Sequence, residues 1–357
     1  MFMVKFRTVL LSRAALAAIL LCAAVAFAQT TPSADAPPPE TFPNTPQQNQ
    51  KPETTFKVNS NLVSIFFTAR DKHNGLIPTL SRGDCSVFED KQPQIIKDFN
   101  AETDLPLTLG ILLDTSPSQV DLLPLEQQVV SQFLHQIMRQ KDEAFLVTFD
   151  VNVDLAQDFT NSVDMLTHAL NQAQINGAGG NGSVGIPGIG QGPFPTQGAP
   201  KGTLLYDAVA ESSQDKLATE TGRKALILFT DGQDQGSRTT AKEAIEAAQK
   251  ANAIVYVVLI ADPWDVYYSQ GMMYSGEGDM RKLTEATGGH VFDVGNKGRK
   301  LQDALDEIQR ELRTQYLLSY IPKDRDLDGR FRSVDIKCGN DIKIQARKGY
   351  YAIGNMQ

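Results

Sequence analysis

From residue 107 onward, short apolar runs alternate with amphipathic stretches, and few folds accommodate such an alternation. Leu107–Leu113 is a continuous apolar run, as expected for a strand that is buried on both faces. Similar runs cover Ala144–Phe149, Ala225–Phe229 and Ile254–Ile260. Strands that alternate with helices predict βαβ units. We therefore expect an α/β fold with a doubly wound, mostly parallel sheet.

The stretches between the apolar runs have helical periodicity. Leu125, Val129 and Phe133 follow one another at intervals of four, which predicts a helix over about 122–139. The same reasoning predicts further helices at about 163–173, 204–217, 241–251, 280–287 and 301–312, and a short strand at 291–294. Together these elements assign residues 104–314 to one α/β domain.

Strand-like sequence flanks this domain on both sides. Apolar and polar residues alternate in Lys57–Arg70, within an N-terminal β segment at 55–103. The pattern returns in a C-terminal β segment at 315–352. Because the α/β domain separates these two segments, we expect them to fold together as one small β-sandwich into which the domain is inserted.

The first 28 residues have the features of a signal peptide. Lys5, Arg7 and Arg13 precede a nearly uncharged run, which ends in the small-x-small pattern Ala26-Phe27-Ala28 that a signal peptidase cuts. Cleavage after Ala28 predicts a secreted or periplasmic protein without a membrane span in the mature chain. The alternative is an uncleaved anchor, which needs about 20 apolar residues.

Two segments have compositions unsuited to packed structure. Residues 29–54 are rich in proline and almost free of aliphatic side chains, which predicts an extended, disordered linker. Residues 176–202 contain ten glycines and several prolines, which predicts a flexible loop within the α/β domain.

Charge and composition exclude several classes of function. The chain has 34 Lys and Arg against 42 Asp and Glu, a net charge of −8, and no basic stripe, which argues against a nucleic-acid binder. Its four histidines form no His-x-x-x-His pair, so a zinc hydrolase of that kind is not expected. Signal cleavage leaves Cys85 and Cys338 in an oxidising compartment. They are either two separate buried thiols or one disulfide between the β segments.

Polar residues with metal-binding chemistry follow two of the buried strands. Asp114-Thr-Ser116-Pro-Ser118 comes directly after Leu107–Leu113, and Thr230-Asp231-Gly232 comes directly after Ala225–Phe229. In an open α/β sheet, ligands bind beyond the carboxyl ends of the strands. A third segment, Gly202-Thr203, begins a predicted helix at the same edge. Carboxylates and hydroxyls are the hard oxygen ligands that Mg²⁺ prefers.

This set of residues resembles the metal-ion-dependent adhesion site (MIDAS) of von Willebrand factor A (VWA) domains. The resemblance rests on Asp114-x-Ser116-x-Ser118, then Thr203, then Asp231, in that order along the chain. More narrowly, residues 56–352 resemble the secreted VWFA-related Acidobacterial domain family. The residues that carry this narrower resemblance are Asn61-Leu-Val63, Val87-Phe-Glu-Asp90, Pro106-Leu107, Gly202-Thr-Leu-Leu-Tyr-Asp-Ala208, Thr230-Asp-Gly-Gln-Asp234, Thr287-Gly-Gly289, Arg313-Thr-Gln-Tyr316 and Arg347-Lys-Gly-Tyr350. The glycine-rich loop is longer than the family pattern, and Pro117 restricts the turn of the first motif.

The resemblance implies roles for the motif residues. Ser116, Ser118 and Thr203 would contact Mg²⁺, or Mn²⁺ or Ca²⁺ in its place, directly. Asp114 and Asp231 would bind it largely through water. A remaining coordination position would accept a carboxylate from a protein partner. Because no nucleophile or general base stands beside these motifs, we expect a binding site and no enzyme.

A second acidic motif predicts a weaker candidate for calcium. Asp324, Asp326, Asp328 and then Asp335 have most of the spacing of an EF-hand loop. However, the twelfth position has Asp where Glu is usual, and strands rather than helices flank the loop. A β-hairpin loop is the alternative interpretation.

Three functions are therefore open at the level of sequence. The favoured hypothesis is a secreted or periplasmic VWA-domain binding module that engages a protein partner through a divalent metal. The first alternative is a structural envelope protein with a vestigial metal site. The second is an enzyme of Mg²⁺-dependent phosphoryl transfer, although the chain has no Gly-x-x-x-x-Gly-Lys loop and no Lys beside Asp114 or Asp231.

Overall fold

The computed structural model describes residues 62–102, 104–175, 202–260 and 276–353. All of them belong to one compact unit. The predicted signal peptide (1–28), the predicted linker (29–54) and nearly all of the glycine-rich segment (176–202) lie outside the described residues. No helix in the described ranges is long and apolar enough to cross a membrane.

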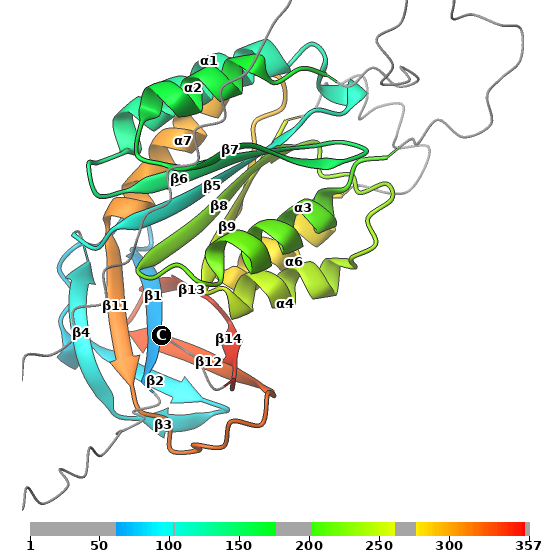
Figure 1. Cartoon of the computed structure of the whole chain (residues 1–357). Coiled ribbons are helices and arrows are strands. Elements are labelled where there is room, and N and C mark those ends of the chain that lie inside the picture. The colour runs from blue at the N-terminus through cyan, green and yellow to red at the C-terminus, as the bar shows by residue number, and fades with distance from the viewer. Residues whose placement is uncertain (1–61, 103, 176–201, 261–275, 354–357) are drawn as a thin grey trace, which may run out of the picture. The chain divides into compact units, whose positions relative to one another are not determined.

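The central sheet confirms the predicted α/β fold (Figure 1). Its strands lie in the order β10-β9-β8-β5-β6-β7. Their bounds are β5 Leu107–Asp114, β6 Glu143–Phe149, β7 Val153–Thr160, β8 Arg223–Thr230, β9 Ala253–Leu259 and β10 Val291–Asp293. Neighbouring strands are parallel, apart from β7, which is antiparallel to β6. The chain starts in the middle at β5, extends to one edge and returns to build the other side, which is a doubly wound sheet.

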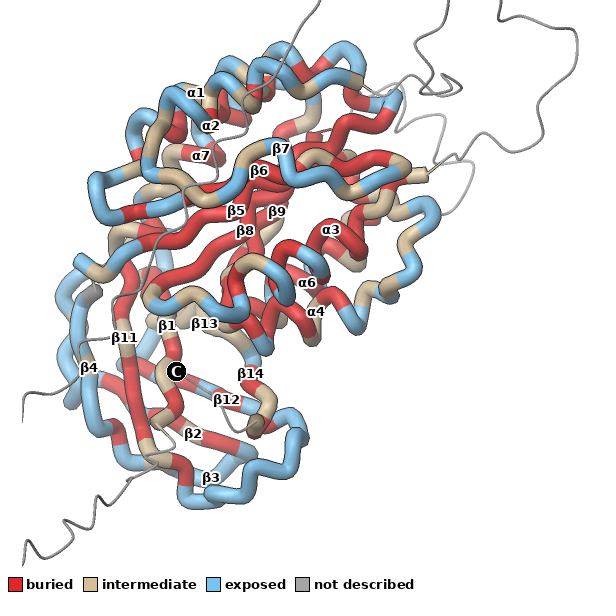
Figure 2. Tube along the Cα trace, in the orientation of Figure 1, coloured by how far each residue is buried: buried red, intermediate tan, exposed pale blue. Residues whose placement is uncertain are grey.

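Helices cover both faces of this sheet (Figure 1). On one face lie α1 Leu123–Ile137, α2 Val163–Gln172 and α7 Gly298–Arg313, and on the other lie α3 Leu205–Glu211, α4 Ala241–Lys250 and α6 Glu277–Thr287. Within β5, Ile111 packs into the first layer and Leu112 into the second. Every residue of β5 and β8 is buried, which explains their continuous apolar sequence (Figure 2).

Two elements differ from the sequence prediction. The helix expected at 204–217 is α3 followed by a π-helical turn, Ser212–Leu217. Strand β7 was not predicted, because it is an edge strand whose residues are mostly exposed or half-buried and which lacks a regular apolar alternation.

The two β segments form a sandwich, as expected. One sheet has the order β13-β1-β11-β4 and the other β14-β12-β2-β3. Their bounds are β1 Val63–Arg70, β2 Cys85–Glu89, β3 Gln92–Gln94, β4 Ile96–Glu102, β11 Gln315–Tyr320, β12 Phe331–Cys338, β13 Lys343–Ala346 and β14 Gly349–Tyr351. Each sheet combines strands from both ends of the chain. The core between the two sheets includes Ile65, Val87, Leu318 and Ile336.

Cys85 and Cys338 form a disulfide in the structure. The two residues lie directly opposite each other on the antiparallel strands β2 and β12. Of the two alternatives left open by the sequence, the structure therefore has the covalent link between the N-terminal and C-terminal β segments.

The two points where the chain passes between sandwich and α/β domain are held together by Arg223, at the start of β8. Its buried guanidinium donates from Nη2 to the carbonyl oxygen of Leu105 at 2.6 Å and from Nη1 to that of Leu312 at 2.5 Å. A second link is the ion pair between Arg70 of β1 and the fully buried Glu311 of α7. These contacts therefore hold the inserted α/β domain against the sandwich.

Candidate metal-binding site

The predicted metal ligands occur at the edge of the central sheet where its parallel strands end. Asp114 is the last residue of β5 and Thr230 the last of β8, while Asp150 follows β6 directly. In a doubly wound sheet this edge is where ligands bind, because the helices that follow the strands leave loops there. The topology therefore brings the first and third predicted motifs to neighbouring strands.

Asp114 is fully buried and held by two donors. Its Oδ1 accepts the backbone N–H of Ser116 at 3.0 Å, and its Oδ2 accepts the hydroxyl of Thr230 at 2.7 Å. The first bond is a local turn that directs the chain away from β5. The second joins the ends of the two central strands. In the sequence, Thr230 is the first residue of the third motif, and the motif pattern alone predicts no role for it.

The surroundings of Asp114 disfavour the ionised form of its carboxyl group. Burial, and after it the neighbouring charge of Asp231, raise its pKa to about 7, against the opposing effect of its hydrogen bonds. Two carboxylates close together in a buried setting repel each other. A divalent cation between them would remove this repulsion and favour the ionised form of both.

Ser116 and Ser118 lie close together, as the motif predicts. Their hydroxyl oxygens share a hydrogen bond of 3.0 Å. Ser116 is buried, whereas Ser118 is exposed. Pro117 begins the 3-10 turn Pro117–Gln119, a position where its fixed φ suits a helical turn. The restriction that proline brings is therefore compatible with the arrangement of the two hydroxyls.

Thr203 is fixed against the loop that begins at Asp231. Its N–H donates to the carbonyl oxygen of Gln235 at 3.1 Å, and its own carbonyl oxygen accepts the Gln235 N–H at 2.9 Å. A Cβ on Gly202 would come within 2.2 Å of the Gln235 carbonyl oxygen, so glycine permits this close approach. The second and third motifs are thus paired through their backbones.

The loop after β6 forms hydrogen bonds with the loop after β5 and with the segment that contains Thr203. Asp150 accepts the hydroxyl of Thr115 at its Oδ2, 3.0 Å away, and its carbonyl oxygen accepts the N–H of Leu204 at 2.8 Å. It therefore connects the residue after Asp114 with the residue after Thr203. Asp150 is a positioning residue that the sequence analysis missed, because only the folded strand order brings these loops together.

Another buried carboxylate interacts with the charge of Asp114. Glu126 of α1 is fully buried, and neither of its carboxylate oxygens has a hydrogen-bond partner among the described residues. Burial raises its pKa to about 8, and the charge of Asp114 contributes. The burial of Glu126 could have been predicted from the sequence, because helical spacing places it between Leu123 and Val130 on the buried face of the helix.

The donor set fits a hard divalent cation. Asp114 and Asp231 supply carboxylate oxygens, and Ser116, Ser118 and Thr203 supply hydroxyl oxygens. Within the described ranges, no group of three or more His, Cys, Asp or Glu side chains is arranged to hold a metal. The five motif residues include only two carboxylates, so they do not form a group of that kind.

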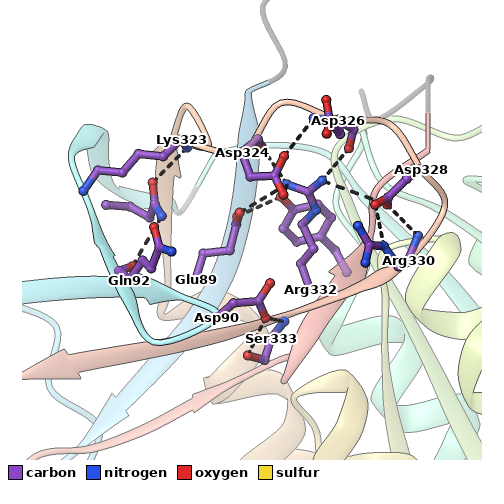
Figure 3. Close-up of polar contacts among 12 residues, drawn as sticks. Glu89, Asp90, Gln92, Lys323, Asp324, Asp326, Asp328, Arg330, Arg332 and Ser333 are labelled. Atoms are coloured by element: carbon purple, nitrogen blue, oxygen red, sulfur yellow. Dashed lines mark hydrogen bonds and ion pairs between the residues drawn. The ribbon is translucent and has the colours of Figure 1, made fainter.

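The acidic loop at 324–332 encloses an arginine of the chain itself (Figure 3). The guanidinium of Arg332 donates from Nη1 to the carbonyl oxygen of Asp324 at 2.6 Å and from Nη2 to that of Asp326. The same group lies 3.2 Å from the Asp324 carboxylate and 4.0 Å from that of Asp328. Arg332 is 4% exposed. The loop's oxygens are therefore directed at an internal cation.

The calcium hypothesis does not fit this arrangement. Arg332 occupies the position where the predicted ligands Asp324, Asp326 and Asp328 would have held calcium. The fourth predicted ligand, Asp335, lies on β12, is exposed and pairs with Lys337 at 3.3 Å. The physical reason is charge: the guanidinium already binds the carbonyl oxygens of Asp324 and Asp326 and pairs with the Asp324 carboxylate, while Arg330 pairs with Asp328. The β-hairpin alternative is also wrong, because the segment connects β11 of one sheet to β12 of the other, and these two strands do not pair.

Comparison with known proteins finds similar solved structures but no match in sequence. No protein-family model matches the chain, and no curated protein matches its sequence. The chain is similar to the solved structure of the conserved hypothetical protein BatB from Bacteroides thetaiotaomicron, with 16% identity and a TM-score of 0.42, over 58% of this chain and 97% of that one. It is similar to the SpRpn10 VWA domain, with 13% identity and a TM-score of 0.38, over 57% of this chain and 95% of that one.

A further similar structure is proximal thread matrix protein 1 from the mussel byssus, with a zinc-occupied MIDAS motif. It has 14% identity and a TM-score of 0.42, over 62% of this chain and 48% of that one. At these identities the argument for function rests on the residues of the site. The doubly wound sheet expected from the resemblance to VWA domains is present, with motif residues at the carboxyl ends of β5 and β8.

Proposed function

We propose that this protein is a VWA-type binding module that engages an acidic protein partner through a divalent metal. The metal, Mg²⁺ or in its place Mn²⁺ or Ca²⁺, would be held by the five motif residues Asp114, Ser116, Ser118, Thr203 and Asp231. A free coordination position on the metal would accept a carboxylate of the partner.

The observation that carries the proposal is the environment of Asp114. A fully buried carboxylate, held by Ser116 and Thr230 and facing the charge of Asp231, is costly without a counter-charge. No Lys, Arg or His side chain among the described residues ion-pairs with Asp114. A bound divalent cation supplies the missing positive charge.

The donor types suggest how the ion would be bound. Hydroxyl oxygens of Ser116, Ser118 and Thr203 are neutral ligands, so the metal would keep most of its charge for a partner's carboxylate. Mg²⁺ retains several of its waters in protein sites, which suits indirect bonds to Asp114 and Asp231. The exposed position of Ser118 supports access from solvent on this side.

We propose binding rather than catalysis. In the described part of the chain, Asp114, Ser116 and Ser118 form hydrogen bonds with hydroxyl and backbone groups, and none of these partners is Cys, His or Lys. A nucleophile paired with a base would be the signature of acyl or phosphoryl transfer, and this arrangement does not supply one. Signal cleavage after Ala28 would place this binding activity in the periplasm or outside the cell.

Thermal unfolding in different metals tests the proposal. The purified chain is unfolded in EDTA and then in Mg²⁺, Mn²⁺ or Ca²⁺, together with the variant Ser118→Ala and the control Asp303→Asn. A metal that binds only the native state raises its stability by RT ln(1 + [L]/Kd), about 2.7 kcal/mol at a hundredfold excess over Kd. Ser118 is exposed, so its variant is expected to fold, and Asp303 is exposed on α7.

The proposal predicts a metal-dependent rise of the melting temperature in wild type and in Asp303→Asn, and a smaller rise in Ser118→Ala. An unchanged melting temperature of wild type in all three metals would contradict it, and would leave the structural envelope protein as the better hypothesis. A rise of equal size in all three proteins would place the metal elsewhere.

A further inference from the structure

A cavity of about 370 Å³ lies on the side of the α/β domain that faces the C-terminal strands. It is bounded by the start of β1, the end of β14, the end of α4 and the segment before β8. The ionisable side chains that line it are Glu220, Lys224, Lys250, Arg347, Tyr350 and Tyr351. Three of these are basic and one is acidic, so the lining carries net positive charge.

Arg347 is the central group of this lining. Its Nη2 donates to the carbonyl oxygen of Ser64 at 3.0 Å, and its guanidinium lies over the ring of Tyr350, 5.9 Å from the centroid. Its Nε is buried and has no hydrogen-bond partner among the described residues. No carboxylate in the described part of the chain forms an ion pair with it. Its charge is therefore unbalanced within the protein.

Lys224 lies beside it in the same lining. Its ammonium group, on a residue only 7% exposed, donates to the carbonyl oxygens of Leu217 at 3.1 Å and Glu220 at 2.8 Å. An ammonium has three N–H donors, so these two bonds leave one for a ligand. Its described partners are neutral carbonyl oxygens rather than a paired carboxylate.

Burial disfavours the charge of both basic groups, and Arg347 also disfavours that of Lys224. Burial lowers the pKa of Lys224 to about 8, the charge of Glu220 opposes this shift, and the charge of Arg347 adds to it. Burial also lowers the pKa of Arg347 to about 10. Two like charges that are withdrawn from water cost free energy, and a bound anion would offset that cost.

Lys250 completes the lining from the rim. It pairs with Glu246 at 2.7 Å and lies over the ring of Tyr351, 5.2 Å from the centroid. Its side chain is 43% exposed, so an anion that enters the cavity from solvent would pass it. Its effect on a ligand would be weaker than that of Arg347, because its charge is already balanced and screened.

We propose that this cavity is a binding site for a small oxoanion group, a phosphate or a carboxylate, with Arg347 as the main ligand and Lys224 and Lys250 in support. A planar guanidinium matches the geometry of both groups. The volume is at the lower end of the range of small-molecule sites, ~300–1,000 Å³, so the anionic group has room to be part of a larger molecule. This site is separate from the residues proposed to bind metal.

The test measures anion-dependent stability of the full chain in EDTA, so that no metal-bound anion contributes. Inorganic phosphate and acetate are titrated separately, and chloride at matched ionic strength corrects for salt. The variant Arg347→Gln removes the central charge, and Arg299→Gln removes an exposed arginine at the start of α7 as the matched control. The rise of melting temperature with concentration gives the apparent Kd for each anion.

The proposal predicts a saturable rise with phosphate or acetate in wild type and in Arg299→Gln. In Arg347→Gln the affinity falls about tenfold or more, as expected for loss of a charge-assisted hydrogen bond. If Arg347→Gln does not fold, Lys250→Gln at the rim is used, with an expected severalfold loss. The anion that binds more tightly identifies the ligand class. No rise beyond that in chloride, or an equal rise in wild type and the cavity variants, overturns the proposal.

Discussion

The hydroxyl of Thr230 donates to the carboxylate of Asp114 at 2.7 Å, and this bond joins the last residues of the two central strands β5 and β8. It is fully buried, and it fixes one oxygen of the carboxylate at the edge of the sheet where the metal is proposed to bind. The strand ends and the motif residues are therefore one structural unit, which makes the bond a natural first target for mutation.

Replacing Thr230 with valine removes this donor and leaves a buried carboxylate oxygen without a partner. The expected loss is about 1–3 kcal/mol of unfolding free energy in EDTA, because the buried acceptor is left unsatisfied. Urea denaturation measures it. Thr230→Ser keeps the hydroxyl and is expected to retain most of the stability, so an equally large loss in the serine variant would mean that the methyl group matters rather than the bond.

Glu126 makes stability depend on pH in a direction opposite to that of an ion-paired carboxylate. Its pKa is about 8 in the folded chain against 4.5 as the ordinary value, so the folded state retains a proton that the unfolded state has lost. Its contribution is complete below about pH 4.5 and is lost as the pH rises toward 8. At 1.36 kcal/mol per pKa unit, the loss between pH 5 and 8 is on the order of 2–4 kcal/mol.

The variant Glu126→Gln does not titrate, so its unfolding free energy in EDTA is expected to fall less steeply between pH 5 and 8 than that of wild type. The residual slope would include Asp114, whose pKa is also raised. The exposed Glu285 of α6 provides the matched control Glu285→Gln, which should follow wild type. Identical pH profiles for wild type and Glu126→Gln would show that the carboxylate is hydrated or paired in solution.

The disulfide closes a loop with a sequence separation of 253 residues. Removing it with Cys85→Ser and Cys338→Ser together is expected to lower the unfolding free energy by about 2–5 kcal/mol, because the unfolded chain gains freedom. Denaturation with and without reductant measures the effect. Reductant should weaken wild type and leave the double variant unchanged, and a wild type that does not respond would indicate that the bond is absent.

Arg332 is expected to stabilise the sandwich far more than its neighbour Arg330. Arg332 is buried and lies 3.6 Å from the buried carboxylate of Glu89, so Arg332→Gln would leave that charge without its cation, at a cost of about 3–5 kcal/mol. Arg330 forms an exposed pair with Asp328, and Arg330→Gln should cost about 0–1 kcal/mol. Equal losses in urea denaturation would contradict this account. Addition of calcium should not restore the unfolding free energy of Arg332→Gln.

The sequence predicted the central elements well because β5 and β8 are buried on both faces, and burial of that kind requires apolar residues throughout. It also predicted that Asp114 and Asp231 would lie at the same edge of the sheet, since parallel strands end at one edge. That their strands β5 and β8 are neighbours is a finding of the structure. By contrast, β7 was missed, because an exposed edge strand needs no apolar pattern.

The remaining parts of the site depend on contacts between distant residues. Asp150 accepts hydrogen bonds from Thr115 and Leu204, and these contacts can be predicted only when the strand order is known. The spacing of Asp324, Asp326 and Asp328 predicts a cation but does not distinguish calcium from a guanidinium, and the cation is Arg332. Likewise, Lys224 and Arg347 are more than 100 residues apart in sequence and line the same cavity only in the folded chain.

The most direct test of the central claim is a titration of the purified chain with Mn²⁺, followed by electron paramagnetic resonance of the free ion. The proteins compared are wild type, Asp114→Asn, which keeps the size of the side chain, and the exposed control Asp303→Asn. The account predicts one tightly bound ion per chain in wild type and in the control, displaced by Mg²⁺, and none in Asp114→Asn. Free Mn²⁺ that rises in proportion to the total in wild type, or equal binding by Asp114→Asn, would contradict it.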